Sequence, residues 1–352
     1  MDEPRPWPFS TAELTAGLRR FTGDHTLIIV EIKDQQLPHS RPSVGRIRGL
    51  SVTCDSTSGP REFFLVLKEP QGATRVGMIG AGRREVSLYT NLADQIPIGI
   101  PKLLAAHPDG DWLVLNLLPG GCEPERWTAD DYLEATDQLV VLHDRFWGLG
   151  SDLVVYPWLA RPLDADLEII KKAASISFQH LSEKSSTNIL TRDSELLLVF
   201  NRMVQHTDKI AALLRSEPTT LLHGDYWPGN INVYADESQI VYDWQHTAIG
   251  PGILDLVKFI QTSHWWFDPL PLENIEITTR YRSGIAKASG YNWEDDTWSI
   301  LWDYAFLWTF ISNWIGLLET IPNPLLHTRF SQLEDLWLKP IRTIVSRRIP
   351  SE

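Results

Sequence analysis

Hydrophobic and polar residues alternate with strand-like spacing in the first third of the chain. Before them, apolar residues spaced by three and four follow Ser10 and predict a helix over residues 10–21. The strands themselves are predicted over residues 26–37, 47–55 and 63–70. A second helix is predicted over residues 81–96, and residues 100–121 predict a hairpin that turns at Pro108-Asp109-Gly110. These elements together predict a small antiparallel sheet with one inserted helix.

Helical spacing dominates the rest of the chain. The strongest helical patterns cover residues 130–147, 167–184 and 195–216. Two short strands are predicted at residues 231–235 and 239–244, with further helices after them. Because Pro119-Gly120-Gly121 separates the two kinds of pattern, we predict a β-rich lobe over residues 1–118 and an α-rich lobe over residues 119–352. The predicted fold class is therefore α+β, with two lobes.

Composition and charge narrow the possible functions. The chain has 352 residues, of which 43% are hydrophobic and 22% charged, as in an ordinary globular protein. Its net charge of -13 argues against a protein that binds nucleic acid by neutralising phosphates. The same charge agrees weakly with a cationic small-molecule partner. We expect no nucleic-acid partner.

Cysteine usage and the apolar runs indicate where the protein works. Cys54 and Cys122 form no C-x-x-C pair, so we expect neither a disulfide framework nor a zinc site, and a reducing compartment such as the cytoplasm. The first 14 residues contain no apolar signal core. The longest uncharged apolar run, residues 304–318, is short for a membrane span and is interpreted as a buried helix. We expect no membrane partner, and the sequence does not indicate an oligomeric state.

The stretch over residues 221–256 places polar groups at the ends of short apolar strands. Asp225 follows one such run and Asn230 comes five residues later, while Asp243 ends a second run. Carboxylates are rare in a core unless they are paired or bind a metal. Oxygen ligands from Asn230 and Asp243 suit Mg²⁺, which takes the rest of its shell from water and substrate phosphates. Asp225 would then be placed to orient an attacking hydroxyl.

The quoted motifs in this stretch resemble those of the aminoglycoside phosphotransferase and choline kinase family, small-molecule relatives of the protein kinases. The residues that carry the resemblance are "HGDYWPGN", "VYDWQ" and "GPGILDL". The resemblance implies ATP and Mg²⁺ as cofactors and a small-molecule hydroxyl as acceptor. It also implies Asp225 as the catalytic base, with Asn230 and Asp243 holding the metal. Asp255 would brace the catalytic loop through backbone N–H groups, and we assign His223 a similar structural role.

The β-rich lobe supplies an independent test of the resemblance. A kinase of this type needs a lysine on a central strand for the α- and β-phosphates and a helix glutamate that holds this lysine. Lys68 ends the apolar run "FFLVLKEP", and Glu85 lies in the next helix within "GRREVSLY". The strand "DWLVLNLLPG" resembles the hinge, where backbone groups near Asn116 and Leu117 would meet adenine. The N-terminal pattern looks more like the ecdysteroid-kinase-like branch than like the compact aminoglycoside-resistance enzymes.

One departure from the family concerns the loop that covers the phosphates. No G-x-G-x-x-G lies between the first two strands. Ser43 and Gly45 in "RPSVGRI" look like the remnant of that loop. We therefore assign them to nucleotide binding by resemblance.

Each assignment has a simpler alternative. Asp225 and Asp243 alone could face solvent at strand ends, and Lys68 alone could extend its charged end to water. Asp255 could be only a helix cap. Trp302 and Trp314 belong to a helical stripe that predicts core packing. The acceptor pocket is instead assigned to aromatic residues close to the metal-binding stretch: Trp227, Trp265 and Trp266.

Three functions compete. A small-molecule kinase accounts for all the motifs. A protein kinase is opposed by the eleven residues between Asp243 and Asp255, which are too few for a peptide platform, and by Trp227 at a position where protein kinases usually have lysine. A non-catalytic nucleotide-binding pseudokinase finds no support, because the five residues of the predicted machinery are all present: Lys68, Glu85, Asp225, Asn230 and Asp243. The identity of the acceptor stays open.

Overall fold

A computed structural model describes residues 7–37, 45–70, 79–118, 120–183 and 189–350 of the chain. The chain forms two compact units. Unit 1 contains Met1–Cys122 and Asn232–His246, and unit 2 contains Glu123–Ile231 and Thr247–Glu352. The segment Asn232–His246 thus packs with unit 1 although it comes late in the sequence. The predicted boundary between residues 118 and 119 assigns this segment to the α-rich lobe.

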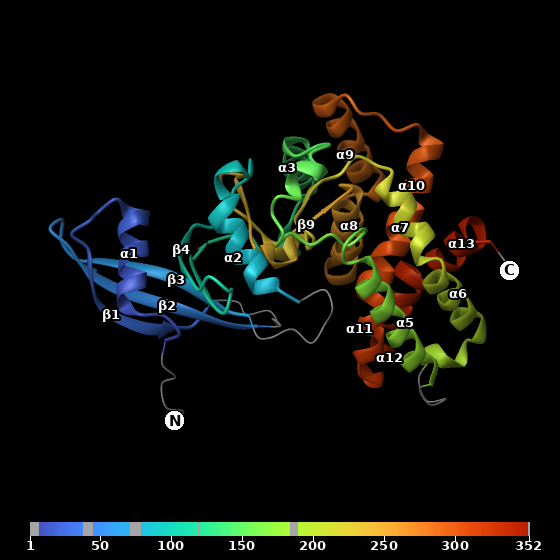
Figure 1. Cartoon of the computed structure of the whole chain (residues 1–352), viewed down its shortest axis with the longest axis horizontal. Helices are drawn as coiled ribbons and strands as arrows, with labels where there is room; N and C mark the ends of the chain where they lie inside the picture. The colour runs from blue at the N-terminus through green and yellow to red at the C-terminus, as the bar shows by residue number, and fades with distance from the viewer. Residues whose placement is uncertain (1–6, 38–44, 71–78, 119, 184–188, 351–352) are drawn as a thin grey trace. The chain divides into compact units, whose positions relative to one another are not determined.

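Unit 1 is built on a five-stranded sheet with the order β1-β2-β3-β5-β4. Every neighbouring pair is antiparallel, as predicted. The strands are β1 (Ile28–Gln35), β2 (Arg46–Asp55), β3 (Arg61–Glu69), β4 (Leu103–Ala106) and β5 (Leu113–Asn116). Figure 1 shows the long strands β1 to β3 as a ribbon with helix α1 beside it.

One side of this sheet is closed by helix α1 (Thr11–Thr22). Ser10 and Glu13 form a reciprocal capping box at its start, which satisfies backbone N–H groups of the first turn. Leu14 and Leu18 of the helix are fully buried in one core cluster with residues of the central strands, including Leu50. Burial of these apolar side chains is the main favourable contribution to the folding of this unit.

Helix α2 (Ala81–Asn91) carries Glu85 on its buried face. Its start lies unusually close to the turn of the β4-β5 hairpin. A Cβ atom on Gly82 would lie 2.2 Å from the Gly110 carbonyl oxygen, so a side chain at this position would collide with backbone. Glycine at residue 82 therefore allows α2 to pack where Glu85 faces β3.

Two small sheets carry the loops around the predicted site residues. Strands β7 (Ile231–Val233) and β8 (Gln239–Val241) form one pair, and β8 leads directly to Asp243. In unit 2, β6 (Thr220–Leu222) pairs antiparallel with β9 (Ala248–Gly250). Strand β6 leads to the His223-Gly224-Asp225 turn. The β7 and β8 runs are strands, as predicted, whereas β9 was not predicted.

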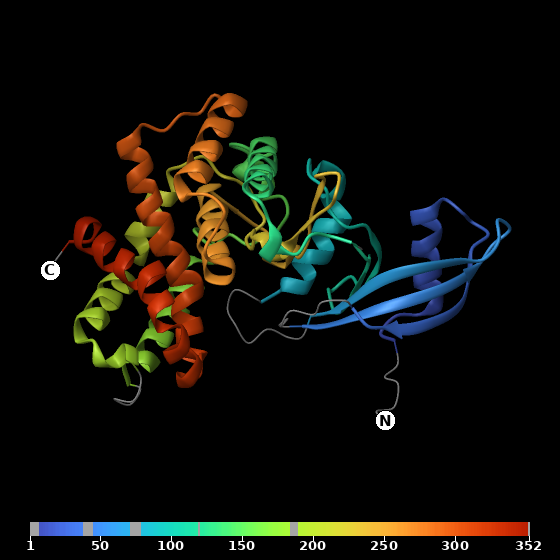
Figure 2. The ribbon, with the colours of Figure 1, turned by 180° about the vertical axis from the view of Figure 1, so that it is seen from behind.

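Unit 2 is mainly helical, as predicted. Helices α8, α9 and α10 lie side by side in both views (Figures 1 and 2). The helices are α3 (Ala129–Arg145), α4 (Gly150–Leu153), α5 (Leu167–Glu183), α6 (Ser194–Gln205), α7 (Thr207–Arg215), α8 (Ile253–Phe267), α9 (Asn274–Ser289), α10 (Asp295–Thr309), α11 (Ile315–Thr320), α12 (Asn323–Leu333) and α13 (Lys339–Arg348).

Two helical patterns are interrupted in the structure. The pattern over residues 195–216 divides at His206, where α6 ends and α7 begins, and the His206 ring lies 2.8 Å from the Arg202 carbonyl oxygen. The apolar run over residues 304–318 is mostly buried but contains a π-helical turn, Phe310–Trp314. Within the described ranges, no helix is long and apolar enough to cross a bilayer.

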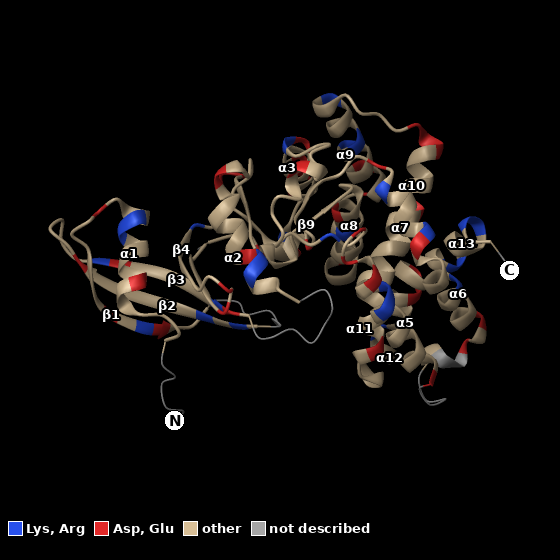
Figure 3. Ribbon diagram, viewed as in Figure 1, with Lys and Arg blue, Asp and Glu red and all other residues tan. Residues whose placement is uncertain are grey.

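Charged residues are distributed over both units (Figure 3). In unit 2, acidic residues begin α10 and basic residues end α13, as the helix dipoles favour. Arg347 and Arg348 of α13 also bind Asp303 of α10, at 2.6 and 2.7 Å. Asp303 is only 3% exposed, so these two arginines compensate the charge of a buried carboxylate.

Candidate active site

The predicted lysine and glutamate of unit 1 form a buried ion cluster together with Asp243. Lys68 is paired with Ile47 of β2 and Leu113 of β5 in the sheet register. Its Nζ atom donates to Glu85 Oε1 at 2.8 Å, to Glu85 Oε2 at 2.7 Å and to Asp243 Oδ1 at 2.7 Å. Unit 1 therefore brings together three residues that are far apart in the sequence.

The charges of this cluster shift its pKa values. Burial alone would lower the pKa of Lys68, but the carboxylates of Asp243 and Glu85 outweigh burial and hold that pKa well above its ordinary value. Burial raises the pKa of Glu85, and the charge of Asp243 adds to this, while Lys68 opposes it. Lys68 is therefore charged at neutral pH and is the cation that both carboxylates share.

A left-handed backbone conformation holds Asp243 in place. Its φ angle is +67°, a region that aspartate adopts more readily than most residues but still uncommonly. The residue follows β8 and precedes a 3-10 turn, Trp244–His246, whose tryptophan is fully buried. Arg84 of α2 donates from Nε to the Gln245 carbonyl oxygen at 2.9 Å. The turn that presents Asp243 is thus anchored on both sides within unit 1.

In unit 2, Asp255 at the start of α8 holds the loop that carries Asp225. Its two carboxylate oxygens accept the backbone N–H groups of His223 at 2.7 Å and of Gly224 at 2.9 Å. Gly224 has φ +79°, which glycine adopts without strain. The Asp225 N–H donates to His223 Nδ1 at 3.1 Å. Asp255 and His223 therefore contact the loop backbone, the position that their predicted structural roles require.

A buried histidine and tyrosine, which sequence reasoning missed, extend this support. His143 of α3 lies with Nε2 3.4 Å from Asp255 Oδ2 and with Nδ1 2.8 Å from the Tyr281 hydroxyl of α9. All three side chains are buried. The sequence offered a weak signal, a histidine within an otherwise apolar stretch of the helix, but no indication of its partner.

Both carboxylate oxygens of Asp225 interact with neighbouring side chains. Oδ1 lies 2.9 Å from Nζ of Lys258, which is on α8 one turn after Asp255. Oδ2 accepts from Asn230 Nδ2 at 2.9 Å and from Trp227 Nε1 at 3.4 Å. Sequence reasoning missed Lys258. Its spacing of three residues from Asp255 on one helix face was the available signal.

The chemistry of the predicted metal ligands fits Mg²⁺. Asn230 uses its amide nitrogen to bind Asp225, so its amide oxygen is the atom that remains to bind a cation. Asp243 supplies a carboxylate, and both are the hard oxygen donors that Mg²⁺ prefers. In the described part of the chain, no group of three or more histidines, cysteines, aspartates or glutamates could hold a metal by itself.

The predicted nucleotide-binding loop and hinge are only partly described. Ser43 lies outside the described residues. Gly45 lies just before β2, and a Cβ atom there would be 3.0 Å from the Glu69 carbonyl oxygen. The Asn116 N–H donates to the Lys102 carbonyl oxygen and the Leu117 N–H to the Phe64 carbonyl oxygen. The role of these residues in binding the nucleotide remains a prediction.

Of the tryptophans assigned to the acceptor pocket, Trp227 contacts Asp225, with its Nε1 atom 3.4 Å from Oδ2. Trp227 is stacked against Trp266 and Phe267, with ring centroids 6.2 and 6.1 Å apart. Trp265 packs edge-on against Trp314 at 4.8 Å. Trp265, Trp266 and Phe267 belong to the last turn of α8, the helix that also carries Lys258.

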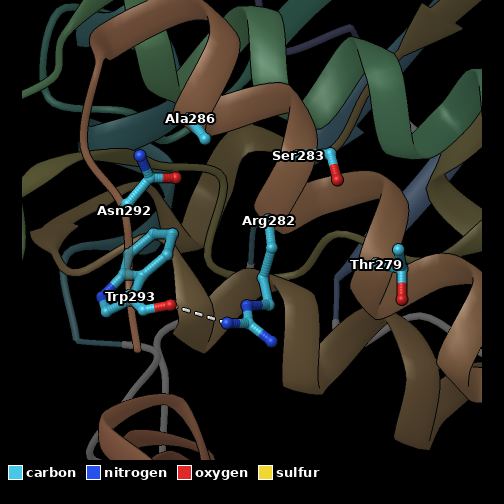
Figure 4. Close-up of a pocket in the computed structure, with 6 residues that line it drawn as sticks. All are labelled: Thr279, Arg282, Ser283, Ala286, Asn292 and Trp293. Atoms are coloured by element: carbon cyan, nitrogen blue, oxygen red, sulfur yellow. Dashed lines mark hydrogen bonds between the residues drawn. The ribbon is translucent and has the colours of Figure 1, made fainter. Parts of the chain in front are cut away.

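A separate pocket of about 350 Å³ lies beside α9 and contains none of the predicted site residues. Figure 4 shows Arg282 in this pocket, with its guanidinium bonded to the Trp293 carbonyl oxygen at 2.7 Å. Arg282 also lies over the Trp298 ring and pairs with Asp295. Because its guanidinium is already engaged by these neighbours, we assign this pocket no role.

The fold is that of the protein-kinase-like phosphotransferases. An ethanolamine kinase of Plasmodium vivax matches 89% of this chain and 83% of its own length, with a TM-score of 0.57 and 13% identity. The choline kinase LicA of Streptococcus pneumoniae matches 90% of this chain and 94% of its own, with a TM-score of 0.50 and 13% identity. An amicoumacin kinase matches 88% of this chain and 90% of its own, with a TM-score of 0.51 and 14% identity. At these identities the similarity concerns the fold.

The sequence itself defines the family. The profile of the phosphotransferase enzyme family, APH, matches residues 57–294, more than half of the chain. A comparison with curated proteins found no match. The chain therefore belongs to the phosphotransferase enzyme family, which confirms the resemblance found in its motifs.

Proposed function

We propose that this protein is a small-molecule kinase that transfers the γ-phosphate of ATP to a hydroxyl group and depends on Mg²⁺. The observation that carries the proposal is the cluster of unit 1, in which Lys68 is held between Glu85 and Asp243. A lysine fixed in this way is what phosphate binding in kinases requires. The five residues of the predicted machinery are distributed over both units, and the family matches across them.

In this proposal unit 1 handles the nucleotide. Lys68 contacts the α- and β-phosphates, and Glu85 keeps its side chain extended toward them. Asp243 and Asn230 would hold Mg²⁺, which screens the negative charge of the phosphates when it is bound. Asn116, Leu117, Ser43 and Gly45 keep their predicted roles around the nucleotide. One fold relative is described in complex with AMP-PNP and Ca²⁺, which is consistent with this arrangement.

Unit 2 handles the acceptor. Asp225 orients the acceptor hydroxyl and receives its proton late in the transfer. Its carboxylate is held by Asn230, Trp227 and Lys258, so its two oxygens have fixed directions. Such fixed geometry is how an enzyme places a base without reorganisation during the reaction. The similarity to an ethanolamine kinase and to a choline kinase supports a small alcohol as the class of acceptor.

We further propose that the chain has two lobes, residues 1–118 and residues 119–352, and that Asn232–His246 of the second lobe packs with unit 1. We also propose that the protein works in the cytoplasm. Support for a reducing compartment comes from the cysteine usage, because Cys54 and Cys122 form no C-x-x-C pair and two cysteines make no disulfide framework. Burial raises the pKa of Cys54 to about 11, which keeps this thiol protonated and unreactive at neutral pH.

The proposal is tested by nucleotide binding and acceptor-dependent turnover. Calorimetry should detect Mg²⁺–ATP binding by the wild type, and Lys68→Ala should weaken nucleotide use at low ATP. Lys33→Ala is the matched control, because Lys33 of unit 1 is 65% exposed and pairs only at the surface with Glu31. ATP consumption is then measured with aminoglycosides, macrolides, choline, amino sugars and sterols. Equal turnover by wild type and Lys68→Ala at low ATP would contradict the role given to Lys68.

A further inference from the structure

The carboxylate that faces the acceptor in the proposed function is already paired with a cation. Nζ of Lys258 lies 2.9 Å from Asp225 Oδ1, and the two side chains are only 17% and 22% exposed. Partial burial strengthens such a pair because less water screens it. A positively charged acceptor that approached Asp225 would therefore meet a neutralised carboxylate and a nearby ammonium group, rather than an uncompensated negative charge.

Next to Asp225 lies an aromatic surface, which we define as Trp227, Trp265, Trp266 and Phe267. The indole N–H of Trp227 lies 3.4 Å from Asp225 Oδ2, so this surface directly adjoins the proposed catalytic base, Asp225. The Trp227 ring is nearly parallel to Trp266 and Phe267, with interplanar angles of 28° and 21°. Trp266 is 52% exposed. Flat, partly exposed rings of this kind favour contact with a flat, apolar molecule.

A second cation occupies this aromatic surface. The Arg329 guanidinium of α12 lies 5.2 Å from the ring centroid of Trp265 and 5.1 Å from that of Trp266. Its Nη1 atom donates to the Trp265 carbonyl oxygen at 3.1 Å, which fixes it in position. Cation–π attraction is the usual way in which aromatic residues recognise quaternary ammonium groups. Here the chain's own arginine already uses that attraction.

The acidic residue next to the aromatic surface is also engaged. Asp268 follows Phe267 and lies with Oδ1 2.9 Å from His264 Nδ1. It is 53% exposed, so water screens its charge. Lys258 beside Asp225 and Arg329 on the aromatic surface are thus two fixed cations. The carboxylates described in this region, Asp225, Asp255 and Asp268, each have a partner.

We propose that the acceptor is an uncharged alcohol carried on a flat apolar or aromatic ring, and that Lys258 and Arg329 exclude cationic acceptors. This inference rests on the proposed kinase function and narrows its substrate class. The flat ring lies against the aromatic surface and brings its hydroxyl to Asp225. Asp225 receives the hydroxyl proton as the acceptor oxygen bonds to the γ-phosphorus and the bond from that phosphorus to the leaving ADP oxygen breaks. The overall charge of -13 does not predict the charge preference here, because the preference depends on groups within a few ångströms of the acceptor.

A matched pair of alcohols tests the inference. We would compare 2-phenylethanol with the 1-(2-hydroxyethyl)pyridinium cation, which has the same shape and hydroxyl but a positive ring. Phosphorylation is measured as acceptor-dependent ADP release, and binding by titration calorimetry without nucleotide. The expected result is a preference for the neutral alcohol of about tenfold or more. Equal or stronger use of the cationic alcohol would overturn the inference.

Three variants assign the preference to its cause. Lys258→Gln and Arg329→Gln should each reduce the ratio between the neutral and the cationic alcohol, even if overall turnover falls. Arg282→Gln is the control, because Arg282 lies 5.1 Å over the Trp298 ring with the same cation–π geometry but on α9, in the pocket of Figure 4. A ratio that changes equally in Arg282→Gln would overturn the assignment.

The binding measurement separates this inference from the proposed function. If Mg²⁺–ATP binds but neither alcohol is phosphorylated, the ratio of the two binding affinities still decides the charge preference. Failure of both alcohols to bind at millimolar concentration would overturn the aromatic surface as the acceptor site. Failure of Mg²⁺–ATP binding would overturn the kinase proposal instead, whatever the alcohols do.

Discussion

The ion cluster around Lys68 in unit 1 and the group around Asp225 in unit 2 hold charged side chains in opposite ways. In unit 1, one ammonium is shared by two carboxylates, and Glu85 is fully buried. In unit 2, one carboxylate is shared by the Lys258 ammonium and by two neutral N–H donors. The first group carries an excess negative charge, whereas the second is balanced.

This difference corresponds to the two substrates of the proposed reaction. An excess of negative charge beside a fixed lysine suits a cofactor that brings a divalent cation together with phosphates. A balanced, partly exposed carboxylate suits a neutral hydroxyl, which must be oriented rather than attracted. The comparison predicts that substitutions at Lys68, Glu85 and Asp243 in unit 1 affect nucleotide and metal use and the stability of the fold. In unit 2, substitutions at Asp225 and Lys258 affect turnover, and Asn230 is the residue that also affects metal use.

The largest effect is expected for Asp243→Ala, which should abolish metal-dependent turnover. Asp243 is the only carboxylate that we assign to the metal. Asn230→Ala should be milder, because a neutral ligand contributes less and water can replace it. Turnover is measured over a range of Mg²⁺ concentrations for both variants. A greater loss in Asn230→Ala would show that the assigned metal shell is wrong.

Asp225→Asn should lower kcat by ~10²–10⁴-fold and leave Mg²⁺–ATP affinity almost unchanged. The amide has nearly the same shape, but it is a far weaker base and presents an NH₂ group to the acceptor. Steady-state kinetics gives kcat, and calorimetry gives the nucleotide affinity. If Mg²⁺–ATP binding collapsed in this variant, Asp225 would be a primary metal ligand and the division between the two units would be reversed.

Lys68→Met should reduce the free energy of unfolding by about 3 kcal/mol, because it leaves Glu85 buried without a cation. The double variant Lys68→Met/Glu85→Gln should recover part of this loss. The loss should also shrink as the pH falls toward the ordinary pKa of glutamate. The reason is that burial already raises the pKa of Glu85, so without Lys68 the carboxylate takes up a proton more readily.

Urea unfolding at several pH values measures these differences. Lys339→Met is the matched control, because Lys339 pairs with Asp335 on an exposed surface of unit 2 and its loss should have no measurable effect. If Lys68→Met were as stable as the wild type at neutral pH, the cluster would not hold the ionised carboxylates that we describe.

The smallest effect is expected for Lys258→Met, which should lower kcat by about tenfold with little change in the KM for ATP. Lys258 acts through Asp225 as a positioning residue, so Lys258→Arg should restore most of the turnover. The split between kcat and KM distinguishes this role from a merely structural one. An increase in the KM for ATP without a change in kcat would move Lys258 from the acceptor side to nucleotide binding.

Much of the fold and of the site could be predicted because their signals are local. The strands that lead to Lys68 and Asp243 are short apolar runs ended by a charge, and the helix that carries Glu85 has regular spacing. The turn before Asp225 and the support from Asp255 lie within one stretch of 36 residues that repeats the family's motif. Local spacing of this kind is fixed by backbone geometry, so these elements can be predicted from the sequence without knowledge of the tertiary structure.

Only the tertiary structure decided which distant side chains form ion pairs and cation–π contacts. It brings Asp243 to Lys68 across 175 positions and packs Asn232–His246 into unit 1. It also places Lys258 against Asp225, His143 against Asp255, and Arg329 over the tryptophans of α8. The physical reason is that an ion pair or a cation–π contact depends on distances between atoms, and these distances exist only once the helices and strands have packed. The sequence by itself therefore determined which chemistry this protein carries, and the packing determined which charges surround it.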